Sequence, residues 1–419
     1  MNKSGTTDVT FPTGSGTSVT IAVPNAALGV SKQIAGSIGA QLKAHTITPY
    51  VYDGTQDFNP PAGNTELIDS AVGSSITLTT PVSDILVTAA GHVTVYDASG
   101  IGTQNLIAGS GGVNYIANTG SGNIIVGGGD NLITIASNTT GTHSIVMGGS
   151  GNNDLELDGG NNVVIGSTGG NVYDMGTGTN VINSYGNDAF YNTGSSTVGN
   201  DTINAAGNSN GLYVDAGANK LLFLNGSGAS TVYGDTGSDT IYGGVGGGYF
   251  QGGTAGNNLM IAGTGQATMI GGGSGDVLAI AGGNASDTLQ AGSGNETLVG
   301  GTSVGKNTFI AGSGSDYIVG GLGNDTIQAG TGSATMFGST GSNEFLFADG
   351  SAGGAVTIGD FGLSVGNKVA LQGYGTNEVQ NALANATVAN GAETITLSDN
   401  TSITFSGFTT LNSSNFVTL

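Results

Sequence analysis

The chain has 419 residues, of which 81 are glycine, 8% are charged and none is cysteine. Its net charge of −22 argues against binding to nucleic acids or anionic membranes, and the absence of cysteine excludes disulfides. So much glycine is typical of disordered chains, but an apolar fraction of 37% is enough for a folded core. No run of 18 apolar residues occurs, so we expect no membrane span.

Residues 1–105 predict a β-rich module with one helix. TDVTF and TSVTIAV alternate polar and apolar residues as strands do, and NAALGVSKQIAGSIGAQLKAH at residues 25–45 combines a helix cap with the spacing of an amphipathic helix. Further short strands are expected at ITLTT, DILVTAA and HVTVYDA. We expect this module either to cap the segment that follows or to act as a separate contact module.

A nine-residue repeat dominates residues 106–346. Segments such as GDTGSDTIY (234–242), AGSGSDYIV (311–319) and GGLGNDTIQ (320–328) fit the template G-G-x-G-x-D-x-U-x, in which U is a large apolar residue. The eighth place is apolar in every unit from Leu155 to Phe345, and we assign Leu212, Leu221 and Leu259 to it. A register that survives small changes in spacing indicates one buried column.

The repeat predicts a parallel β-solenoid. DTIQ-like runs form very short strands, and the Gly-rich portions form turns in which a side chain would be strained. A single unit cannot bury its own apolar residue, whereas stacked units can. We therefore expect two units per turn, with one strand on each of two faces.

The array resembles the repeats-in-toxin (RTX), or hemolysin-type calcium-binding, proteins. This resemblance implies a parallel β-roll in which the sixth-place Asp and backbone carbonyls of the turns coordinate Ca²⁺ between successive turns. Hard oxygen ligands on flexible loops suit Ca²⁺ better than Mg²⁺ or transition metals. Units n and n+2 lie on the same side, so a site needs acids two units apart.

The sixth place changes along the chain. It holds only Asn from Asn153 to Asn180, and later becomes mainly acidic, with the richest same-side pairs at Asp276/Glu296 and Glu296/Asp316. Ala334 ends the file of Asp316. For the Asn-rich part we favour amides stacked in a ladder without metal. For the acidic part we favour calcium over a merely solvated acidic face, because like charges opposed on neighbouring strands repel. The candidate metal ligands are Asp239, Asn257, Asp276, Asp287, Glu296, Asn307, Asp316, Asp325 and Asp360.

Residues 347–419 predict a C-terminal β cap. TIGDFGLSVGNKVALQGYG resembles the segment that closes such arrays, and ETITLSDNTSITFSGF predicts a hairpin. The chain ends in SSNFVTL, which is similar to uncleaved signals of the type I secretion route, whereas the N-terminal stretch lacks the apolar core of a signal peptide.

No catalytic pattern stands out, so we expect no enzyme. The three His are scattered, and neither HExxH nor G-x-S-x-G occurs. The leading interpretation is an extracellular bacterial structural protein that binds calcium and assembles with itself, as a surface-layer, filament or biofilm-matrix subunit. The alternatives are an adhesin for cell-surface polysaccharide or an abiotic surface and, with less support, an ice-binding protein.

Overall fold

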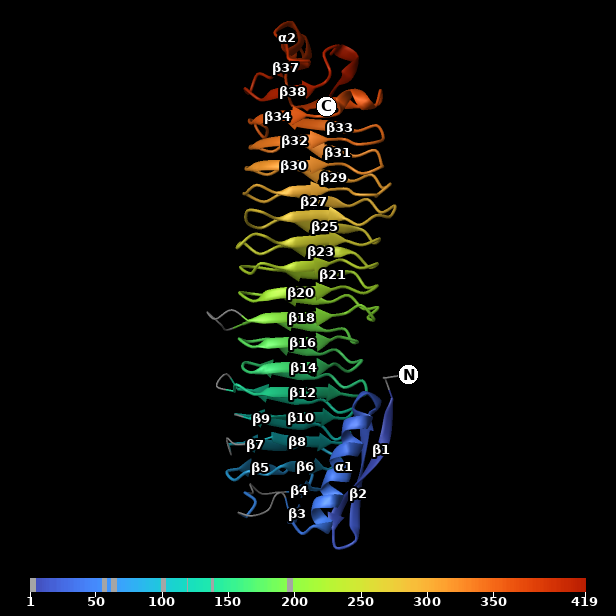
Figure 1. Cartoon of the computed structure of the whole chain (residues 1–419), viewed down its shortest axis with the longest axis vertical. Coiled ribbons are helices and arrows are strands. Elements are labelled where there is room, and N and C mark those ends of the chain that lie inside the picture. Colours follow the sequence, from blue (N-terminus) through green and yellow to red (C-terminus); the bar gives the residue numbers. More distant parts are fainter. Residues whose placement is uncertain are drawn as a thin grey trace. The chain divides into compact units, whose positions relative to one another are not determined.

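The protein consists of two compact units, Met1–Asn219 and Lys220–Leu419, which are described separately below. The computed structural model describes residues 5–54, 59–61, 66–98, 103–118, 120–136, 139–193 and 199–419. In each unit short strands alternate between an even-numbered and an odd-numbered sheet (Figure 1). Neighbours within these two sheets are parallel throughout the repeats, so each unit is a parallel β-solenoid. The expected all-β class and β-roll architecture are confirmed.

Unit 1 begins with a hairpin and a helix that precede its solenoid strands. These first elements are β1 (Thr6–Gly14), β2 (Thr17–Pro24), the 3-10 turn η1 (Asn25–Ala27) and α1 (Leu28–Lys43). The even-numbered sheet, which includes β3, contains β3 (Pro49–Tyr52), β4 (Glu66–Asp69), β6 (Asp84–Val87), β8 (Thr103–Ala108), β10 (Ser121–Val126), β12 (Thr142–Met147), β14 (Asn161–Ile165), β16 (Thr179–Asn183) and β18 (Asn200–Asn204). The odd-numbered sheet contains β5 (Ser75–Leu78), β7 (Val93–Asp97), β9 (Val113–Ala117), β11 (Leu132–Ile135), β13 (Asp154–Leu157), β15 (Val172–Asp174), β17 (Ala189–Tyr191) and β19 (Tyr213–Asp215).

Unit 2 continues the alternation and ends in a cap. Its even-numbered sheet contains β20 (Lys220–Leu224), β22 (Thr240–Tyr242), β24 (Leu259–Ala262), β26 (Val277–Ile280), β28 (Thr297–Val299), β30 (Ser315–Val319), β32 (Ser333–Phe337) and β34 (Ala355–Ile358). Its odd-numbered sheet contains β21 (Ser230–Tyr233), β23 (Gly248–Gln251), β25 (Ala267–Ile270), β27 (Thr288–Gln290), β29 (Thr308–Ile310), β31 (Thr326–Gln328), β33 (Glu344–Ala348) and β35 (Lys368–Gln372). The cap adds η2 (Phe361–Leu363), α2 (Glu378–Ala384), β36 (Thr387–Ala389), β37 (Ala392–Thr396), β38 (Ser402–Ser406), η3 (Ser413–Asn415) and β39 (Phe416–Thr418).

The eighth-place side chains fill the space between the two sheets of each unit. Side chains such as Phe190, Phe309 and Ile327 are fully buried, as the apolar column predicted. Three assignments were wrong, because longer turns shift the strand by one or two residues. The column members are Val214, Phe223 and Met260 in place of Leu212, Leu221 and Leu259.

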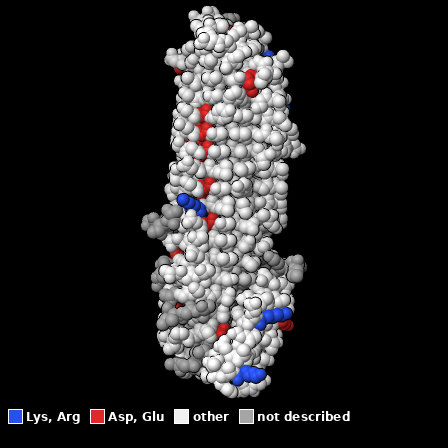
Figure 2. All heavy atoms as spheres, in the orientation of Figure 1, with Lys and Arg blue, Asp and Glu red and all other residues white. Residues whose placement is uncertain are grey.

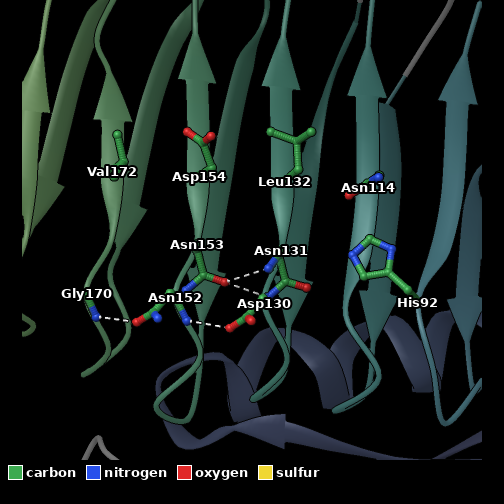
Figure 3. A pocket seen from close by; sticks show the side chains of 10 residues that line it. All are labelled: His92, Asn114, Asp130, Asn131, Leu132, Asn152, Asn153, Asp154, Gly170 and Val172. Atoms are coloured by element: carbon green, nitrogen blue, oxygen red, sulfur yellow. Dashed lines mark hydrogen bonds between the residues drawn. The ribbon is translucent and has the colours of Figure 1, made fainter.

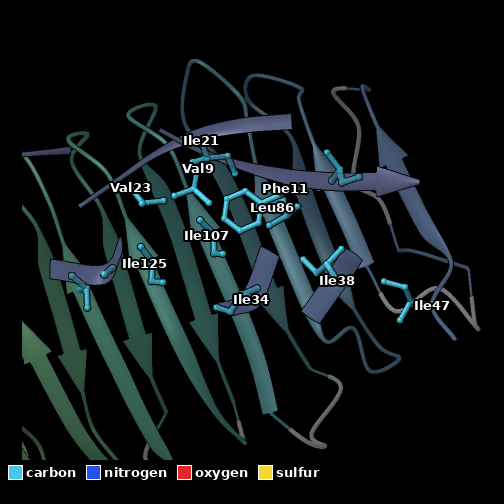
Figure 4. Close-up of a cluster of buried hydrophobic side chains, with 13 residues drawn as sticks. Val9, Phe11, Ile21, Val23, Ile34, Ile38, Ile47, Leu86, Ile107 and Ile125 are labelled. Carbon is cyan, nitrogen blue, oxygen red and sulfur yellow. The ribbon is translucent and has the colours of Figure 1, made fainter. Parts of the chain in front are cut away.

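The first elements of unit 1 form a module, β1 to α1, that covers the outer face of the even-numbered sheet (Figure 4). Phe11 and Ile38 from the module are fully buried in one cluster with Leu86 and Ile107 from β6 and β8. The covered residues stand at the ninth place of their units, directly after the inward-facing residue. Side chains alternate between the two faces of a strand, so a ninth-place side chain points away from the core between the sheets. The ninth-place residues are apolar here because they form the surface on which the module packs.

Two details of the N-terminal region differ from expectation. We expected the array to begin at residue 106, but the parallel pairing already begins at β3 and β4. The early turns lack the Gly-rich template, so only their strands reveal the solenoid. The predicted helix segment began at Asn25, but α1 begins at Leu28 with Ala27 as its N-cap, and the Oδ1 of Asn25 accepts a hydrogen bond from Thr7 Oγ1 at 2.6 Å.

The cap of unit 2 breaks the parallel pattern. β38 pairs in parallel with β34, but β37 and β36 follow as antiparallel strands, which confirms the predicted hairpin. The odd-numbered sheet ends with β39, which contains Phe416 of the chain's last segment and pairs in parallel with β35. The aromatic ring of Phe361 packs at 5.0 Å from that of Phe405 and closes the apolar column.

Candidate metal centre

The Gly-rich turns of unit 2 end in polar side chains that fold back under the turn. In Asp276, Asp316 and Asp325 the Oδ2 atom accepts a hydrogen bond from the backbone N–H four residues earlier, at 2.6, 2.7 and 2.8 Å. The turn of Asp325 begins with Gly320, where a Cβ would lie 2.6 Å from Gly338 O and 3.0 Å from Asp325 Oδ2, whereas the turn of Asp316 begins with Ala311. The sixth-place carboxylates are therefore buried within the turns, which does not fit a solvated acidic face.

The same side chains also bind the turn before them. In the Asp and Asn residues at the sixth place, the Oδ1 atom accepts a hydrogen bond from the backbone N–H of the sixth-place residue one solenoid turn earlier. These bonds run from Leu221 to Asp239 (3.0 Å), Asp239 to Asn258 (2.8 Å), Asn258 to Asp276 (2.8 Å), Glu296 to Asp316 (3.0 Å), Ala267 to Asp287 (2.7 Å), Asp287 to Asn307 (3.1 Å), Asn307 to Asp325 (2.9 Å) and Asp325 to Asn343 (2.9 Å). Each polar side chain thus links two successive turns.

The sixth-place residues form two files, one along each edge of unit 2. In the even-edge file Asp276, Glu296 and Asp316 follow one another in the expected order, and Asp316 pairs with Ala334, where the acids end. The odd-edge file runs through Asp287, Asn307, Asp325 and Asn343. Figure 2 shows acidic atoms aligned in a column on one face of the protein.

Two acidic side chains of the even-edge file keep a buried oxygen without a hydrogen-bond partner among the described residues. Glu296 Oε1 accepts a hydrogen bond from Gly294 N at 2.9 Å, but Glu296 Oε2 and Asp239 Oδ2 have none. Desolvation, and after it the neighbouring Asp316 and Asp276, raises the pKa of Glu296 to about 8. Desolvation also raises the pKa of Asp239 to about 7. These oxygens lack a cationic partner.

The odd edge is less acidic. Burial raises the pKa of Asp287 and Asp325, although backbone hydrogen bonds counteract the effect in both. Asn307 lies between them, and its Nδ2 donates a hydrogen bond to the buried Ser303 Oγ at 3.2 Å. This amide takes the place of a third carboxylate, so the odd edge has fewer uncompensated charges.

The donor atoms fit a hard divalent cation. In the part of the chain that the structure describes, no three Asp, Glu or His side chains converge on one point. A cation at the even edge would therefore use one or two carboxylates, such as Glu296 and Asp316, and take its other ligands from backbone carbonyls. Successive Gly-rich turns of this edge lie in close contact, since a Cβ at Gly332 would lie 2.0 Å from Gly314 O. Ca²⁺ accepts such mixed, flexible oxygen sets, whereas Mg²⁺ demands a tighter octahedron.

Two predicted ligands differ from the rest. Asn257 is exposed in a turn with φ of 56°, and the residue in the even-edge file is its neighbour Asn258, so the assignment of Asn257 was wrong by one residue. Asp360 lies at the last Gly-rich turn, where its two oxygens accept hydrogen bonds from Gly338 N (2.8 Å) and Ser339 N (2.7 Å). Its carboxylate therefore already has two backbone donors.

Sequence reasoning also missed Asn367, which closes the odd-edge file. Its Oδ1 accepts a hydrogen bond from Asn343 N at 2.9 Å, and its Nδ2 donates one to Phe361 O at 3.0 Å. The signal was present, because Gly-Asn before the strand KVAL repeats the end of the template.

Unit 1 carries amide ladders at the corresponding places (Figure 3). On the odd edge the Nδ2 of each Asn donates to the Oδ1 of the next residue, from Asn131 to Asn153 (2.6 Å), Asn153 to Asn171 (2.6 Å) and Asn171 to Asp188 (2.7 Å). The even edge repeats the pattern from Asn162 to Asn180 and from Asn180 to Asp201, both at 2.9 Å. These bonds confirm the predicted stacking of Asn amides.

A shallow groove of about 310 Å³ lies beside the odd-edge ladder of unit 1. Figure 3 shows the side chains that line it: His92, Asn114, Asp130, Asn131, Leu132, Asn152, Asn153, Asp154, Gly170 and Val172. Asp130 Oδ1 accepts a hydrogen bond from Asn152 N at 2.7 Å, so the fifth-place residues are linked as well. Most of the residues that line the groove have polar side chains, and Leu132 and Val172 are apolar.

The repeats match a known family model. The model of the RTX calcium-binding nonapeptide repeat (4 copies) matches residues 145–182, 225–249, 279–304, 302–336 and 310–344, the last three of which include Glu296 and Asp316 of the even-edge file. Comparison with curated proteins gives no significant match. Among the described residues no helix has both the length and the hydropathy needed to cross a membrane.

Comparison with solved structures gives a distant likeness. The crystal structure of extracellular lipase LipA from Serratia marcescens matches with 16% identity and a TM-score of 0.20. The match covers 82% of this chain, which spans 45% of the lipase chain. A likeness this weak carries no argument about activity. The nonapeptide turns, their buried sixth-place side chains and the family match agree with one another: within residues 145–182, 225–249 and 279–344 this chain carries RTX calcium-binding nonapeptide repeats.

Proposed function

We propose that this chain is an extracellular structural protein that binds calcium along the even edge of unit 2 and assembles with itself, as a subunit of a bacterial surface layer, filament or biofilm matrix. The observation that carries the proposal is the buried Oε2 atom of Glu296, which has no hydrogen-bond partner among the described residues and lies near Asp316 and Asp276. The family match supports calcium as the cation and secretion as the route.

The expected role of the ion is to hold successive turns together. A cation bound only by the folded turns stabilises them by mass action, and extracellular sites commonly have a Kd of about 10⁻⁴–10⁻³ M. Repulsion along the even-edge file opposes folding at low calcium, so export by a type I route, followed by folding outside, is part of the proposal. Thermal unfolding of the purified chain, followed by circular dichroism with calcium and with chelator, tests this step, and equal thermal midpoints would contradict it.

Self-assembly is tested by electron microscopy of the full chain at millimolar Ca²⁺. We expect fibres or sheets with calcium and dispersed particles with chelator. The variant Glu296→Gln should need more calcium to assemble, whereas Glu156→Gln, an exposed acid of unit 1, should behave as wild type. Dispersed particles of the wild type at every calcium concentration would refute the proposal.

A second candidate, an adhesin for cell-surface polysaccharide, is favoured by the groove of unit 1. Exposed side chains such as His92 and Asp154 next to Leu132 offer hydrogen-bonding groups and an apolar contact of the kind that sugar hydroxyls and ring faces use. Binding to immobilised bacterial polysaccharide should fall in a His92→Ala/Asp154→Ala variant. Equal retention of variant and wild type would remove this candidate.

A further inference from the structure

The even-numbered sheet of unit 2 has a nearly continuous apolar outer face. The ninth-place residues of β20 to β32 pair in one register, and six of the seven are large and apolar: Leu224, Tyr242, Ile261, Val299, Val319 and Phe337. The remaining ninth-place residue, Ala279 in β26, is an alanine. We call this file, with the seventh-place residues beside it, the apolar face; three of those seventh-place residues are threonines, Thr240, Thr297 and Thr335.

The apolar face is open to solvent in the described structure of unit 2. Tyr317 is 46% exposed, Tyr242 38% and Val277 36%, and the six ninth-place side chains are half-buried or exposed. None of its seventh- or ninth-place residues is charged. The opposite sheet differs, because its ninth place alternates Gln and apolar residues, as in Gln290 and Ile310.

Unit 1 shows how this chain treats such a file. There the ninth-place residues Ile68, Leu86, Ile107, Ile125 and Val146 pair in one register and are buried beneath the β1 to α1 module. The next ninth place, Ile165, is partly buried against the edge of that cluster. The two ninth places after it, Asn183 and Asn204, lie beyond the cluster, are polar and hydrogen-bond to each other at 3.1 Å. Ninth-place apolar residues in a run thus accompany a covering layer, and polar residues take over where the layer ends.

We infer that the apolar face of unit 2 is a docking surface for the same face of a second copy of this chain. This inference rests on the proposed self-assembly and names its interface. Two copies with a net charge of −22 each repel one another, and this uncharged face lets them meet without burying carboxylates. Because the face is flat and apolar, two copies pack as a β-sandwich does, with the sheets about 10 Å apart.

The size of the face sets the strength of the contact. Seven strands spaced about 4.8 Å apart, with two outward positions each, give a patch of roughly 450 Å². Two patches remove roughly 900 Å² from solvent, which lies at the low end for specific association. The expected contact is therefore a weak two-fold pairing that depends on protein concentration. Calcium strengthens it by lowering the net charge of each copy.

Sedimentation velocity of the full chain at millimolar Ca²⁺, over a range of protein concentrations, tests the inference. The wild type should shift from monomer to dimer or larger species. Val299→Lys/Val319→Lys should remain monomeric over the same range. The control Ile310→Lys/Gln328→Lys makes the same change in net charge on the opposite sheet and should associate as wild type. Val299→Thr/Val319→Thr, which keeps β-branched residues, should associate at least threefold more weakly.

Each outcome separates the interface from the function. If the wild type associates and the Val299→Lys/Val319→Lys variant associates equally, the apolar face is refuted and the proposed self-assembly stands. If the wild type stays monomeric, both are refuted. Flotation of a monomeric wild type with neutral phosphatidylcholine vesicles would overturn the inference in favour of a lipid surface. Unchanged calcium-dependent circular dichroism of each variant establishes that it is folded.

Discussion

Replacing Glu296 by Gln should change the number of protons that calcium displaces. With a pKa of about 8, Glu296 of the folded, calcium-free protein holds about 0.9 proton at pH 7. Carboxylate ligands must be ionised to bind a metal, so calcium binding expels that proton. Asp239, with a pKa of about 7, adds about half a proton if it too becomes a ligand. The variant should therefore release about one proton fewer than the wild type.

Isothermal titration calorimetry in phosphate and in Tris measures this number, because the two buffers differ in ionisation enthalpy. Circular dichroism must first show that the calcium-free protein is folded, since an unfolded chain would hold no proton on Glu296 at pH 7. Glu344→Gln on the outer face of β33 is the matched control and should release as many protons as wild type. Equal proton release by Glu296→Gln and wild type would refute the reasoning.

The same raised pKa predicts how stability depends on pH without calcium. The folded state binds the proton of Glu296 more tightly than the unfolded state, whose pKa is near 4.5. This contribution is fully present below about pH 4.5 and is lost as the pH rises through about 8, with a slope of at most ~1.4 kcal/mol per pH unit. Denaturant titrations with chelator at pH 5 and pH 8 should show this loss, and calcium should reduce it.

Three further predictions concern the rest of the fold. Glu66 in β4 is fully buried, and neither of its oxygens has a hydrogen-bond partner in the described part of the chain. Desolvation, followed by the Asp84 charge, raises its pKa to about 7, so Glu66→Gln should raise the free energy of unfolding at pH 8 but not at pH 5. Phe309→Ala removes a fully buried ring and should cost about 3–5 kcal/mol in denaturant titrations, against at most ~1 kcal/mol for its half-buried neighbour Ile310→Ala. Gly332→Ala, whose Cβ would lie 2.0 Å from the Gly314 carbonyl oxygen, should lower the thermal midpoint and weaken calcium binding, whereas a Cβ at Gly353 has open space and should change neither.

Each of these has a contrary result. A Glu66→Gln effect of the same size at both pH values would mean that packing, not ionisation, governs that site. Equal losses for Phe309→Ala and Ile310→Ala would contradict an inward column. A Gly332→Ala variant with the thermal midpoint and the calcium affinity of the wild type would contradict the predicted clash between successive turns.

The solenoid could be predicted because the nine-residue pattern recurs in every unit. The residue of each strand that faces the core could not always be predicted. Leu221 illustrates the limit, since it is apolar and nearly at the expected spacing, yet a longer turn moves Phe223 into the column. The same kind of slip put Asn257 in place of Asn258. The length of each turn varies from unit to unit, and a template with a fixed period of nine does not represent this variation.

Other features depend on contacts between distant segments. The burial of Ile107 beneath the β1 to α1 module could not be read from its strand, because an apolar ninth place looks the same whether it is covered or exposed. The partnerless oxygen of Glu296 arises because Glu is longer than the Asp of the template, and its surroundings are set by three successive turns. Sequence could place the acid on its edge but could not show which oxygen lacks a partner.

The antiparallel strands that end unit 2 restrict how copies can be joined. A parallel ladder offers the same edge to every next rung, so it could be extended by the first rung of another molecule. The hairpin of β37 and β38 replaces this edge with one of opposite direction, and the short, exposed β36 stands outermost. The even-numbered sheet of unit 2 therefore ends in an antiparallel edge that does not continue the parallel ladder, whereas the odd-numbered sheet keeps a parallel edge at β39. End-to-end stacking of copies would continue the parallel ladder of one sheet but not of the other.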